Sequence, residues 1–436
     1  MRDTFIMLIV MGMLPVALAR PFVGVLIAAW LSMMSPHRLG WGFAYGFPFV
    51  YVTVLVTLVG IFLTRDRRTF PIATSSILLF LLIFWGCVTT VFALSYDLAY
   101  ERLIFTLKIL ALPILALVVI NTRERIHALV WVTVLSLGFY GVKGGIFTLM
   151  TGGSHRVWGP PGTFIADNNQ LALALIMTLP LIRYLQLETR SRLVRLALTA
   201  MLGLSVVSIL GSHSRGALVG LSVTALALAM LSRRKLLLSA LIVVSFGGAF
   251  MMMPDSWHDR MSTLGESSEN QDASVQGRFE IWALSARVAL DRPLVGGGFD
   301  MLDAQVTYDR YGPEIVPRSA HSITFQVLGE HGFVGLFLFY ALIAGTWLKG
   351  IDIRRKLRGR PDLLWASELA TMVQISLIGY VTAGQFLNLA FFDLLFFVIA
   401  VMIATGALIG REAAQHKARQ WSSEMLPGRL AEQRPA

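Results

Sequence analysis

His321 is the side chain in this sequence best suited to proton transfer. It ends the polar stretch Arg318-Ser319-Ala320-His321, and a long apolar run begins soon after it. An imidazole titrates near neutral pH and can accept a proton from a hydroxyl group, so His321 is a candidate general base. The alternative is a residue that caps a helix or reaches back to the membrane surface. Glu330 and His331 follow inside the apolar run, where they either face a wet cavity or satisfy one another.

Arg215 is the second candidate, within the short polar segment 211–216 between apolar runs at 196–211 and 216–232. A helix of about 16 residues is about 24 Å long, which is shorter than the roughly 30 Å of hydrocarbon in a bilayer. We therefore expect Arg215 to lie below the membrane surface. A guanidinium group there needs an anion, and its geometry suits phosphate oxygens. A salt bridge to a loop carboxylate, or a contact with lipid head groups, is the alternative.

Several further cations are expected on the same, outward side of the membrane: Arg156, Arg278, Arg310, Arg318, and Lys143 within Val142-Lys143-Gly144-Gly145. Positive charge is normally sparse on the non-cytoplasmic side, so this set suggests an anionic ligand, although some of its members will balance nearby carboxylates. The sequence has no HExxH motif, no cluster of Cys and His and no Walker-type loop. We therefore expect no metal and no cofactor, and any group transfer has to use a substrate that is already activated.

The composition shows what must position these side chains. Of the 436 residues, 56% are hydrophobic and 14% are charged, against about 25% charged in a typical soluble domain. Apolar runs near the ~20 residues that cross a bilayer recur along the chain. The net charge of +11 is explained by cytoplasmic Lys and Arg rather than by a nucleic-acid partner. We predict an all-α polytopic membrane protein of about 12 transmembrane helices.

Basic clusters predict how the chain crosses the membrane. They occur at 65–68, 123–125, 190–195, 233–235, 354–360 and after 411. Placing all six in the cytoplasm predicts eleven spans that alternate correctly, near 43–63, 75–94, 103–120, 126–150, 168–188, 196–211, 216–232, 236–253, 322–348, 364–384 and 387–409.

The first 35 residues do not fit this scheme simply. Residues 5–35 are too long for one straight crossing, and Arg20-Pro21 divides them into halves too short for two. With a cytoplasmic N-terminus an odd number of crossings is required, so we expect one crossing and a re-entrant or interfacial piece. Residues 1–19 also have the pattern of a signal peptide ending in Ala17-Leu18-Ala19. An uncleaved first helix is the favoured interpretation, because the following spans do not need it removed.

The longest polar segment, 254–321, is expected to form a small helical subdomain on the outer membrane surface. Its stretch Arg278–Asp291 has helical periodicity, with Ile281, Trp282, Leu284 and Val288 as an apolar stripe. A solvated connection without structure is the alternative, but ordered loops of this length tend to be functional. The expected divisions are a transmembrane bundle at 1–253, the loop subdomain at 254–321, transmembrane helices at 322–410 and a cytoplasmic tail at 411–436.

With these elements in place, the chain resembles the O-antigen ligase/polymerase superfamily of membrane glycosyltransferases. The matching elements are Ser214-Arg215-Gly216-Ala217-Leu218, Gly277-Arg278 followed by Trp282, Asp291-Arg292-Pro293-Leu294-Val295-Gly296-Gly297-Gly298-Phe299, and His321-Ser322. His321 stands eleven residues before Gly332, as in the H-x10-G pattern of O-antigen ligases. The family's R-x-x-x-L pattern is not kept, because Val219 takes the leucine position after Arg215.

A narrower resemblance is to the exosortase-associated O-glycosylation ligase branch. It is carried by Ser35-Pro36-His37-Arg38-Leu39-Gly40-Trp41-Gly42-Phe43-Ala44-Tyr45, Lys143-Gly144-Gly145, Gly159-Pro160-Pro161-Gly162-Thr163-Phe164 and Asn168-Asn169.

The resemblance implies a fold similar to GT-C glycosyltransferases and a site on the periplasmic face of the bacterial inner membrane. The donor would be a glycan linked to undecaprenyl diphosphate, and the acceptor would be lipid A–core, with membrane lipids around them. His321 would act as base, and Arg215 and Arg278 would bind the diphosphate. Arg318, Arg156 and Lys143 would assist them, and Asn169 would orient phosphate or sugar. The family implies an inverting reaction without a metal.

Other functions stay open at this point. An O-antigen polymerase or a protein O-oligosaccharyltransferase would use the same donor with another acceptor. A small-solute transporter is the alternative from a different class. It should show paired broken helices in two related halves and ionisable groups at the midplane, whereas the candidate groups here gather at the outer boundary.

Overall fold

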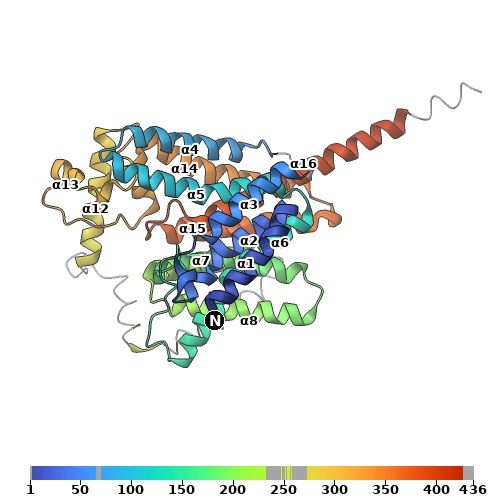
Figure 1. The fold of residues 1–436 in the computed structure, drawn as a ribbon, viewed down its shortest axis with the longest axis horizontal. Helices are drawn as coiled ribbons and strands as arrows, with labels where there is room; N and C mark the ends of the chain where they lie inside the picture. The colour runs from blue at the N-terminus through green and yellow to red at the C-terminus, as the bar shows by residue number, and fades with distance from the viewer. Residues whose placement is uncertain are drawn as a thin grey trace, which may run out of the picture.

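A computed structural model describes residues 2–64, 70–231, 247, 251, 253–255, 257 and 273–425. These residues form α-helices joined by turns and short 3-10 helices, without a strand in the part described (Figure 1). The main helices are α1 (Arg2–Ala19), α2 (Pro21–Met34), α3 (Phe49–Leu63), α4 (Thr74–Val91), α5 (Tyr96–Val119), α6 (Arg123–Met150), α7 (Asn168–Glu188), α8 (Arg192–Leu210), α9 (Arg215–Leu231), α12 (Ala273–Asp291), α13 (Gln305–Tyr311), α14 (Ile323–Lys356), α15 (Leu364–Gly384) and α16 (Asp393–Met425).

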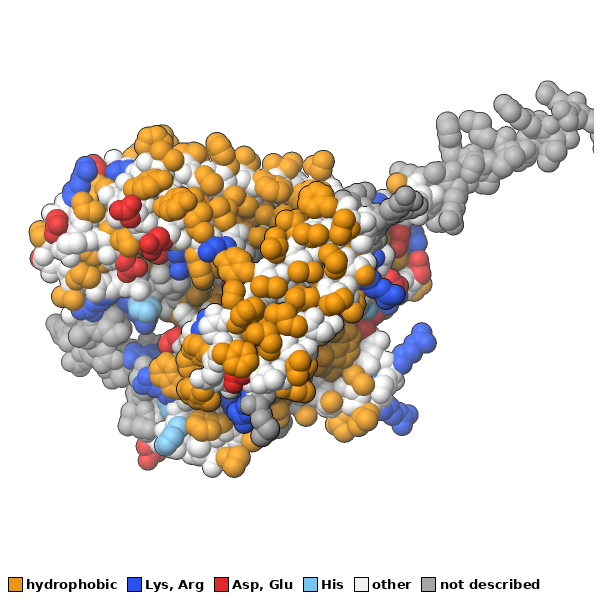
Figure 2. Space-filling model, in the orientation of Figure 1, with side chains coloured by type: hydrophobic (Ala, Val, Ile, Leu, Met, Phe, Trp, Pro, Cys, Tyr) orange, Lys and Arg blue, Asp and Glu red, His pale blue; other side chains and the backbone are white. Residues whose placement is uncertain are grey.

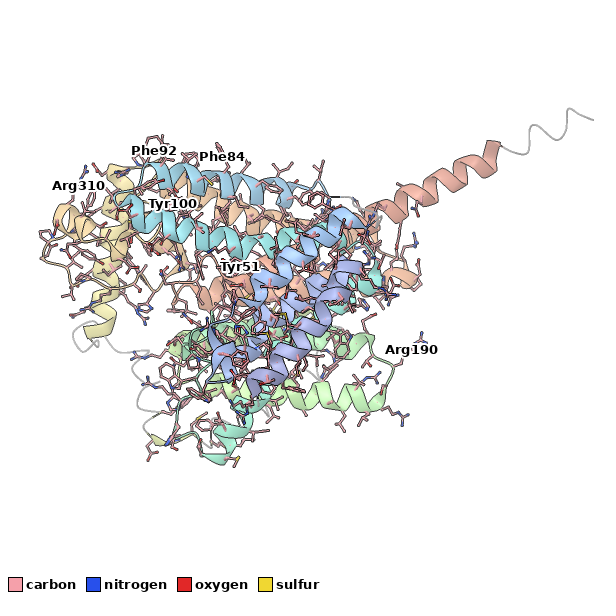
Figure 3. All side chains as sticks on the ribbon, viewed as in Figure 1. Tyr51, Phe84, Phe92, Tyr100, Arg190 and Arg310 are labelled. Atoms are coloured by element: carbon pink, nitrogen blue, oxygen red, sulfur yellow. The ribbon has the colours of Figure 1, made fainter. Side chains whose placement is uncertain are left out.

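The helices are those of a polytopic membrane protein, as predicted. Within the described residues, ten are long and apolar enough to cross a bilayer, and the apolar helices α3 and α9 are shorter. The face in Figure 2 is largely hydrophobic between two more highly charged ends. Large side chains such as Tyr51 and Phe84 are exposed on the helices (Figure 3), as expected for surfaces that face lipid. The predicted span at 236–253 lies mostly outside the described residues.

The bundle has two different ends. At one end, the loop end, Tyr45 donates to the carbonyl of Pro161, Val157 N to Gly211 O, and Leu94 N to Gly297 O. This end also carries α12 and α13, and Arg310 marks it in Figure 3. At the other, the basic end, Arg123 pairs with Glu188 and Arg411 donates to Asn121 O, near Arg190 in Figure 3.

The prediction for the N-terminus was wrong. Two helices, α1 and α2, occupy the segment where one crossing and a re-entrant piece were expected. Helix α1 is long enough to cross a bilayer, and α2 reaches that length together with the 3-10 turn Pro36–Leu39. Asp3 accepts from Gly42 N and Ala44 N, so the start of α1 lies at the loop end. The end of α1 touches Gly60 near the end of α3. Arg20 therefore turns the chain at the basic end, with Pro21 at the first turn of α2, where proline is tolerated.

The part of the long loop that the structure describes contains the helices α12 and α13, joined by turns and irregular segments. Ile281, Leu284 and Val288 form a buried stripe along α12, as the periodicity predicted. They pack against Met301 and Tyr308, which come from the short 3-10 helix Met301–Asp303 and from α13. These contacts form a small core of their own beside the main one. Trp282 points elsewhere and contacts the start of α14.

Candidate functional site

Three helices begin close together at the loop end, and each has a polar cap. Asp167 caps α7 and accepts from Asn169 N at 2.9 Å. Ser214 caps α9 and accepts from Ala217 N at 3.1 Å. Ser322 caps α14 and accepts from Phe325 N. Asn168 at the start of α7 donates to Ser212 O in the turn before α9 (2.6 Å), which ties two of these starts together. Helix N-termini carry partial positive charge and favour anions.

Helix α14 is folded rather than straight, and the fold is made by Gly332. The backbone there has φ 67° and ψ −169°, a conformation open essentially to glycine alone. The fold brings the hydroxyls of Thr324 and Tyr340 within 2.5 Å of each other. In a straight helix these two residues would be about 24 Å apart along the axis. The glycine of the H-x10-G pattern thus turns back the short arm 323–331, which starts beside His321.

The segment after α12 holds this arm in place. At a break, the last carbonyls of a helical arm lose their partners in the next turn. Here the amides of Gly297 and Gly298 donate to Gly329 O (2.7 Å) and Glu330 O (2.8 Å). Phe333 N donates to Pro293 O at 2.8 Å. A Cβ atom on Gly332 would lie 2.5 Å from Leu294 O, so close approach as well as conformation requires glycine.

His321 is fixed by backbone contacts on the N-terminal side of the arm. Its φ of 46° lies in the left-handed region, which costs a non-glycine residue roughly 1–2 kcal/mol. The indole N–H of Trp282 donates to Ala320 O at 2.7 Å, and the indole stacks on Phe325 with ring centroids 4.9 Å apart. Helix α12 therefore sets the position of His321, and Trp282 is the link between them.

The charges of Arg215, Arg278, His321 and Asp167 form a chain of interactions, in which Arg215 acts on Arg278 and both Arg278 and Asp167 act on His321. Burial, and then the positive charge of Arg215, lower the pKa of Arg278, whose guanidinium group stays protonated at neutral pH. Burial, and then the positive charge of Arg278, lower the pKa of His321, while Asp167 acts to raise it. The His321 side chain still presents surface to solvent. Two arginines and a neutral, accessible imidazole thus share one site, here named the His321 site.

The remaining predicted residues are distributed differently. Arg318 lies across Gly277, next to Arg278, where a Cβ on Gly277 would meet its guanidinium group. Asn169 donates to the Asp167 and Asn168 side chains, at 2.8 and 3.2 Å, so it supports the start of α7. Asp167 was missed as a site residue. In the sequence it shows only the pattern of a helix cap, and that pattern does not indicate that it lies close to His321.

Gln385, in the turn after α15, was also missed. Its carbonyl oxygen accepts from Thr324 (2.7 Å) and Ser322 (3.4 Å), and its amide donates to Tyr340 OH at 3.1 Å. The nearby Phe386 lies against Gly216, directly after Arg215. Its position in the sequence, 64 residues after His321, gave no sign of this contact.

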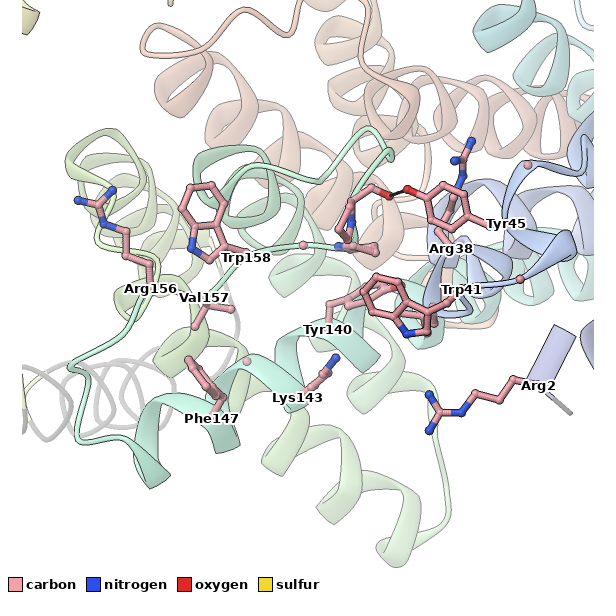
Figure 4. Close-up of a pocket in the computed structure, with 17 residues that line it drawn as sticks. Arg2, Arg38, Trp41, Tyr45, Tyr140, Lys143, Phe147, Arg156, Val157 and Trp158 are labelled. Atoms are coloured by element: carbon pink, nitrogen blue, oxygen red, sulfur yellow. Dashed lines mark hydrogen bonds between the residues drawn. The ribbon is translucent and has the colours of Figure 1, made fainter.

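Lys143 and Arg156 lie in a separate cavity of about 810 Å³ (Figure 4). None of Arg215, Arg278, His321 or Asp167 lines it. We call it the cationic cavity, after its basic lining residues Arg2, Arg38, Lys143 and Arg156. The sequence grouped Lys143 and Arg156 with Arg215 because all lie on the same side of the membrane, but a shared side does not fix their separation within the membrane plane.

Glu330 and His331 are buried inside the bundle. His331 Nδ1 lies 2.8 Å from Thr89 Oγ1, and its Nε2 lies 3.7 Å from a carboxylate oxygen of Glu330. The other carboxylate oxygen of Glu330 accepts from Asp300 N and from Gln326. Within the described residues neither His331 Nε2 nor the facing Glu330 oxygen has a hydrogen-bond partner, so the two side chains are neighbours that do not satisfy each other. Among the residues that the structure describes, no three His, Cys, Asp or Glu side chains gather as metal ligands do.

Comparison with known families finds two overlapping matches within residues 1–340. Residues 170–340 match a family described as O-Antigen ligase, and residues 1–190 match a family of unknown function. No curated protein matches the chain. The first match supports the O-antigen ligase/polymerase superfamily and a glycosyltransferase type of activity, and it contains Arg215, Arg278 and His321. The cationic cavity falls entirely within the second match.

Proposed function

We propose that the protein transfers a glycan from undecaprenyl diphosphate to a lipid A–core acceptor at the His321 site. The single observation that carries this is the meeting of two arginines and a neutral imidazole at three helix N-termini. Such a site offers positive charge for a diphosphate and a base for a hydroxyl. On this proposal the loop end faces the periplasm and the basic end faces the cytoplasm of a bacterial inner membrane.

In the reaction, an acceptor hydroxyl oxygen attacks the anomeric carbon of the donor glycan. A new glycosidic C–O bond forms as the bond from that carbon to the diphosphate oxygen breaks. The hydroxyl proton passes to the imidazole of His321, and the lipid diphosphate leaves with the bonding electrons. Arg215 and Arg278 stabilise the charge that grows on the leaving oxygen. Attack opposite the leaving group inverts the anomeric centre.

The donor's polyprenyl chain is proposed to lie along the groove between α14 and α15. This groove has a volume of about 560 Å³ and is lined mainly by apolar residues, Ile343, Trp347, Leu377 and Val381 among them. Tyr340 is one of the polar residues that line the groove. Its hydroxyl contacts Gln385 and Thr324, which lie next to Ser322. A chain in the groove would therefore present its diphosphate near His321.

The site is compatible with other acceptors of the same glycan. A polymerase would receive a second lipid-linked glycan, and a protein O-oligosaccharyltransferase would receive a Ser or Thr hydroxyl. A transporter is less well supported, because the arginines and His321 gather at one end of the bundle instead of the midplane.

The proposal is tested in cells that lack the gene and carry wild-type protein, His321→Ala or Arg215→Ala. On a lipopolysaccharide gel, wild-type protein restores the whole ladder, while both variants leave lipid A–core bare and lipid-linked glycan accumulates. Arg287→Ala, an exposed arginine paired with Glu314 at the same end, is the matched control and restores the ladder. A ladder restored by His321→Ala would contradict the proposal, and loss of chain length alone, with one repeat attached, would indicate the polymerase.

A further inference from the structure

The cationic cavity has the chemical character of a binding site for an anionic sugar. Its volume of about 810 Å³ lies within the ~300–1,000 Å³ of small-molecule pockets. Four cations line it, without a carboxylate among its lining residues. Within the part of the chain that the structure describes, none of these four has an ion-pair partner. Positive charge concentrated in this way favours a phosphate or carboxylate ligand.

The carboxylate that follows Arg2 in the chain is engaged by backbone amides. Asp3 accepts from the backbone amides of Gly42 and Ala44, both at 3.2 Å, and so fixes the turn after α2. Arg38 lies over the ring of Tyr45, 4.5 Å from its centroid, which holds the guanidinium group in place. In Figure 4 the charged ends of Lys143 and Arg2 extend toward the same space below Trp41. Lys143 and Arg2, from two parts of the chain, therefore direct their charges toward one volume, whereas the charged ends of Arg38 and Arg156 point away from it in Figure 4.

Two tryptophans add flat apolar surface to the cavity. Trp41 is 88% exposed and Trp158 is 57% exposed, and both lie in loop segments at the loop end. An indole face suits the C–H face of a pyranose ring, and an aromatic side chain with a polar edge is favoured at a membrane interface. Cations together with open indoles match a phosphorylated sugar attached to lipid better than a free inorganic ion.

One loop connects the cavity to the His321 site. Residues 157–161 line the cavity, and Asp167, six residues later, interacts with His321. The loop is closed on itself by Gly159 N donating to Ala166 O, and a Cβ on Gly159 would lie 1.8 Å from Ile165 O. Val157 N also donates to Gly211 O, in the turn that leads to Arg215. A ligand in the cavity would therefore lie beside the proposed reaction centre without occupying the place of the diphosphate.

We infer that the cationic cavity binds the phosphorylated saccharide head of the lipid-anchored acceptor. This inference rests on the proposed function, which identifies the ligand as the acceptor. It assigns Lys143 and Arg156 to the acceptor instead of the donor diphosphate. The region matched only by the family of unknown function would then select the acceptor, and the O-antigen ligase region would perform the transfer.

Binding is measured with purified full-length protein and three lipids: a diphosphorylated, acylated glucosamine disaccharide, the same lipid after phosphatase treatment, and phosphatidylglycerol. The first should bind at least about tenfold more tightly than either of the others. Lys143→Gln and Arg156→Gln should each weaken its binding about tenfold, and Trp41→Ala should weaken it while Trp41→Phe retains most of the affinity. Both cations are exposed, so folding is checked directly by thermal unfolding.

The controls separate this inference from the proposed function. Arg287→Ala removes a cation outside the cavity and should leave binding unchanged. His321→Ala should also bind the phosphorylated lipid normally, even if transfer is lost. Equal binding of phosphatidylglycerol or of the dephosphorylated lipid, or normal binding by Lys143→Gln, would overturn the inference. If His321→Ala still transfers glycan while Lys143→Gln loses lipid binding, the proposed chemistry at His321 would be rejected and the binding role of the cationic cavity would stand.

Discussion

The His321 site and the cationic cavity lie at the same end of the bundle but are constructed differently. Around His321 the backbone determines the position of the polar groups: three capped helix starts, a left-handed residue and a glycine that folds α14. Around Lys143 the charges stand on long side chains, and the tryptophans are open to solvent. Bond making requires reacting groups to be held within fractions of an ångström, whereas binding of a head group needs charge and contact area.

Because the two sites are constructed differently, removal of one cation should change the kinetic constants differently in the His321 site and in the cationic cavity. Arg215→Ala should lower kcat by about 10²- to 10³-fold, because the charge on the leaving diphosphate loses a preorganised partner. Lys143→Ala should leave kcat nearly constant and raise KM for the acceptor. Steady-state kinetics with reconstituted protein measure both constants, and a kcat effect of equal size in the two variants would remove the distinction.

Gly332→Ala tests whether the fold in α14 positions the catalytic group. An alanine there has to adopt a glycine conformation, and its Cβ meets two carbonyl oxygens. We expect a loss of roughly 2–4 kcal/mol of stability and a fall in kcat of about 100-fold. Gly12→Ala is the matched control, since nothing lies within 4 Å of its Cβ. Thermal unfolding and transfer rates are measured on both, and normal activity in Gly332→Ala would contradict this role.

Trp282→Phe tests the link between α12 and His321 with a smaller expected effect. The substitution retains a ring to stack on Phe325 but removes the hydrogen bond to Ala320 O. One lost hydrogen bond costs about 1 kcal/mol, and kcat should fall about tenfold with KM little changed. Trp30→Phe, which removes the indole contact with Met34 Sδ in α2, should leave kcat unchanged. A pure KM effect in Trp282→Phe would argue against a positioning role.

The pH dependence of kcat tests the charges around His321, with the smallest expected effect. As base, the imidazole must be neutral, so kcat should be constant above the pKa of His321 and fall as the pH drops through it. Burial and Arg278 hold this pKa below its ordinary value, and Asp167 opposes them. Arg278→Gln should therefore move the acid limb to higher pH. Asp167→Asn, which can still cap α7, should move it to lower pH. Identical acid limbs in all three proteins would exclude His321 as the titrating group.

Much of this arrangement was predictable from residue patterns. Apolar runs and basic clusters gave most of the spans, the periodicity of 278–291 gave the buried face of α12, and the shared side of the membrane brought Arg215, Arg278 and His321 together. The fold at Gly332 was not predictable, because hydropathy continues across it. It depends on hydrogen bonds from 293–298, more than thirty residues away in the chain.

Two other features lay beyond the sequence patterns for different reasons. The N-terminal pair α1 and α2 was missed because spanning length is completed by the 3-10 turn at 36–39, which adds little apolar periodicity. That Lys143 and Arg156 line a cavity which none of Arg215, Arg278 and His321 lines depends on where helices lie within the membrane plane. Charge patterns report the side of the membrane and give no position within that plane.

Single-turnover transfer by purified protein in lipid nanodiscs measures whether His321 acts as the base. Synthetic undecaprenyl-diphosphate glycan and lipid A–core are supplied, and glycosylated acceptor and free lipid diphosphate are both quantified. Wild-type protein should form the two products in equal amounts, and His321→Ala should form both at a rate reduced by about 10²- to 10⁴-fold. Transfer by His321→Ala at the wild-type rate, with Arg287→Ala also unchanged, would contradict the claim that His321 is the base.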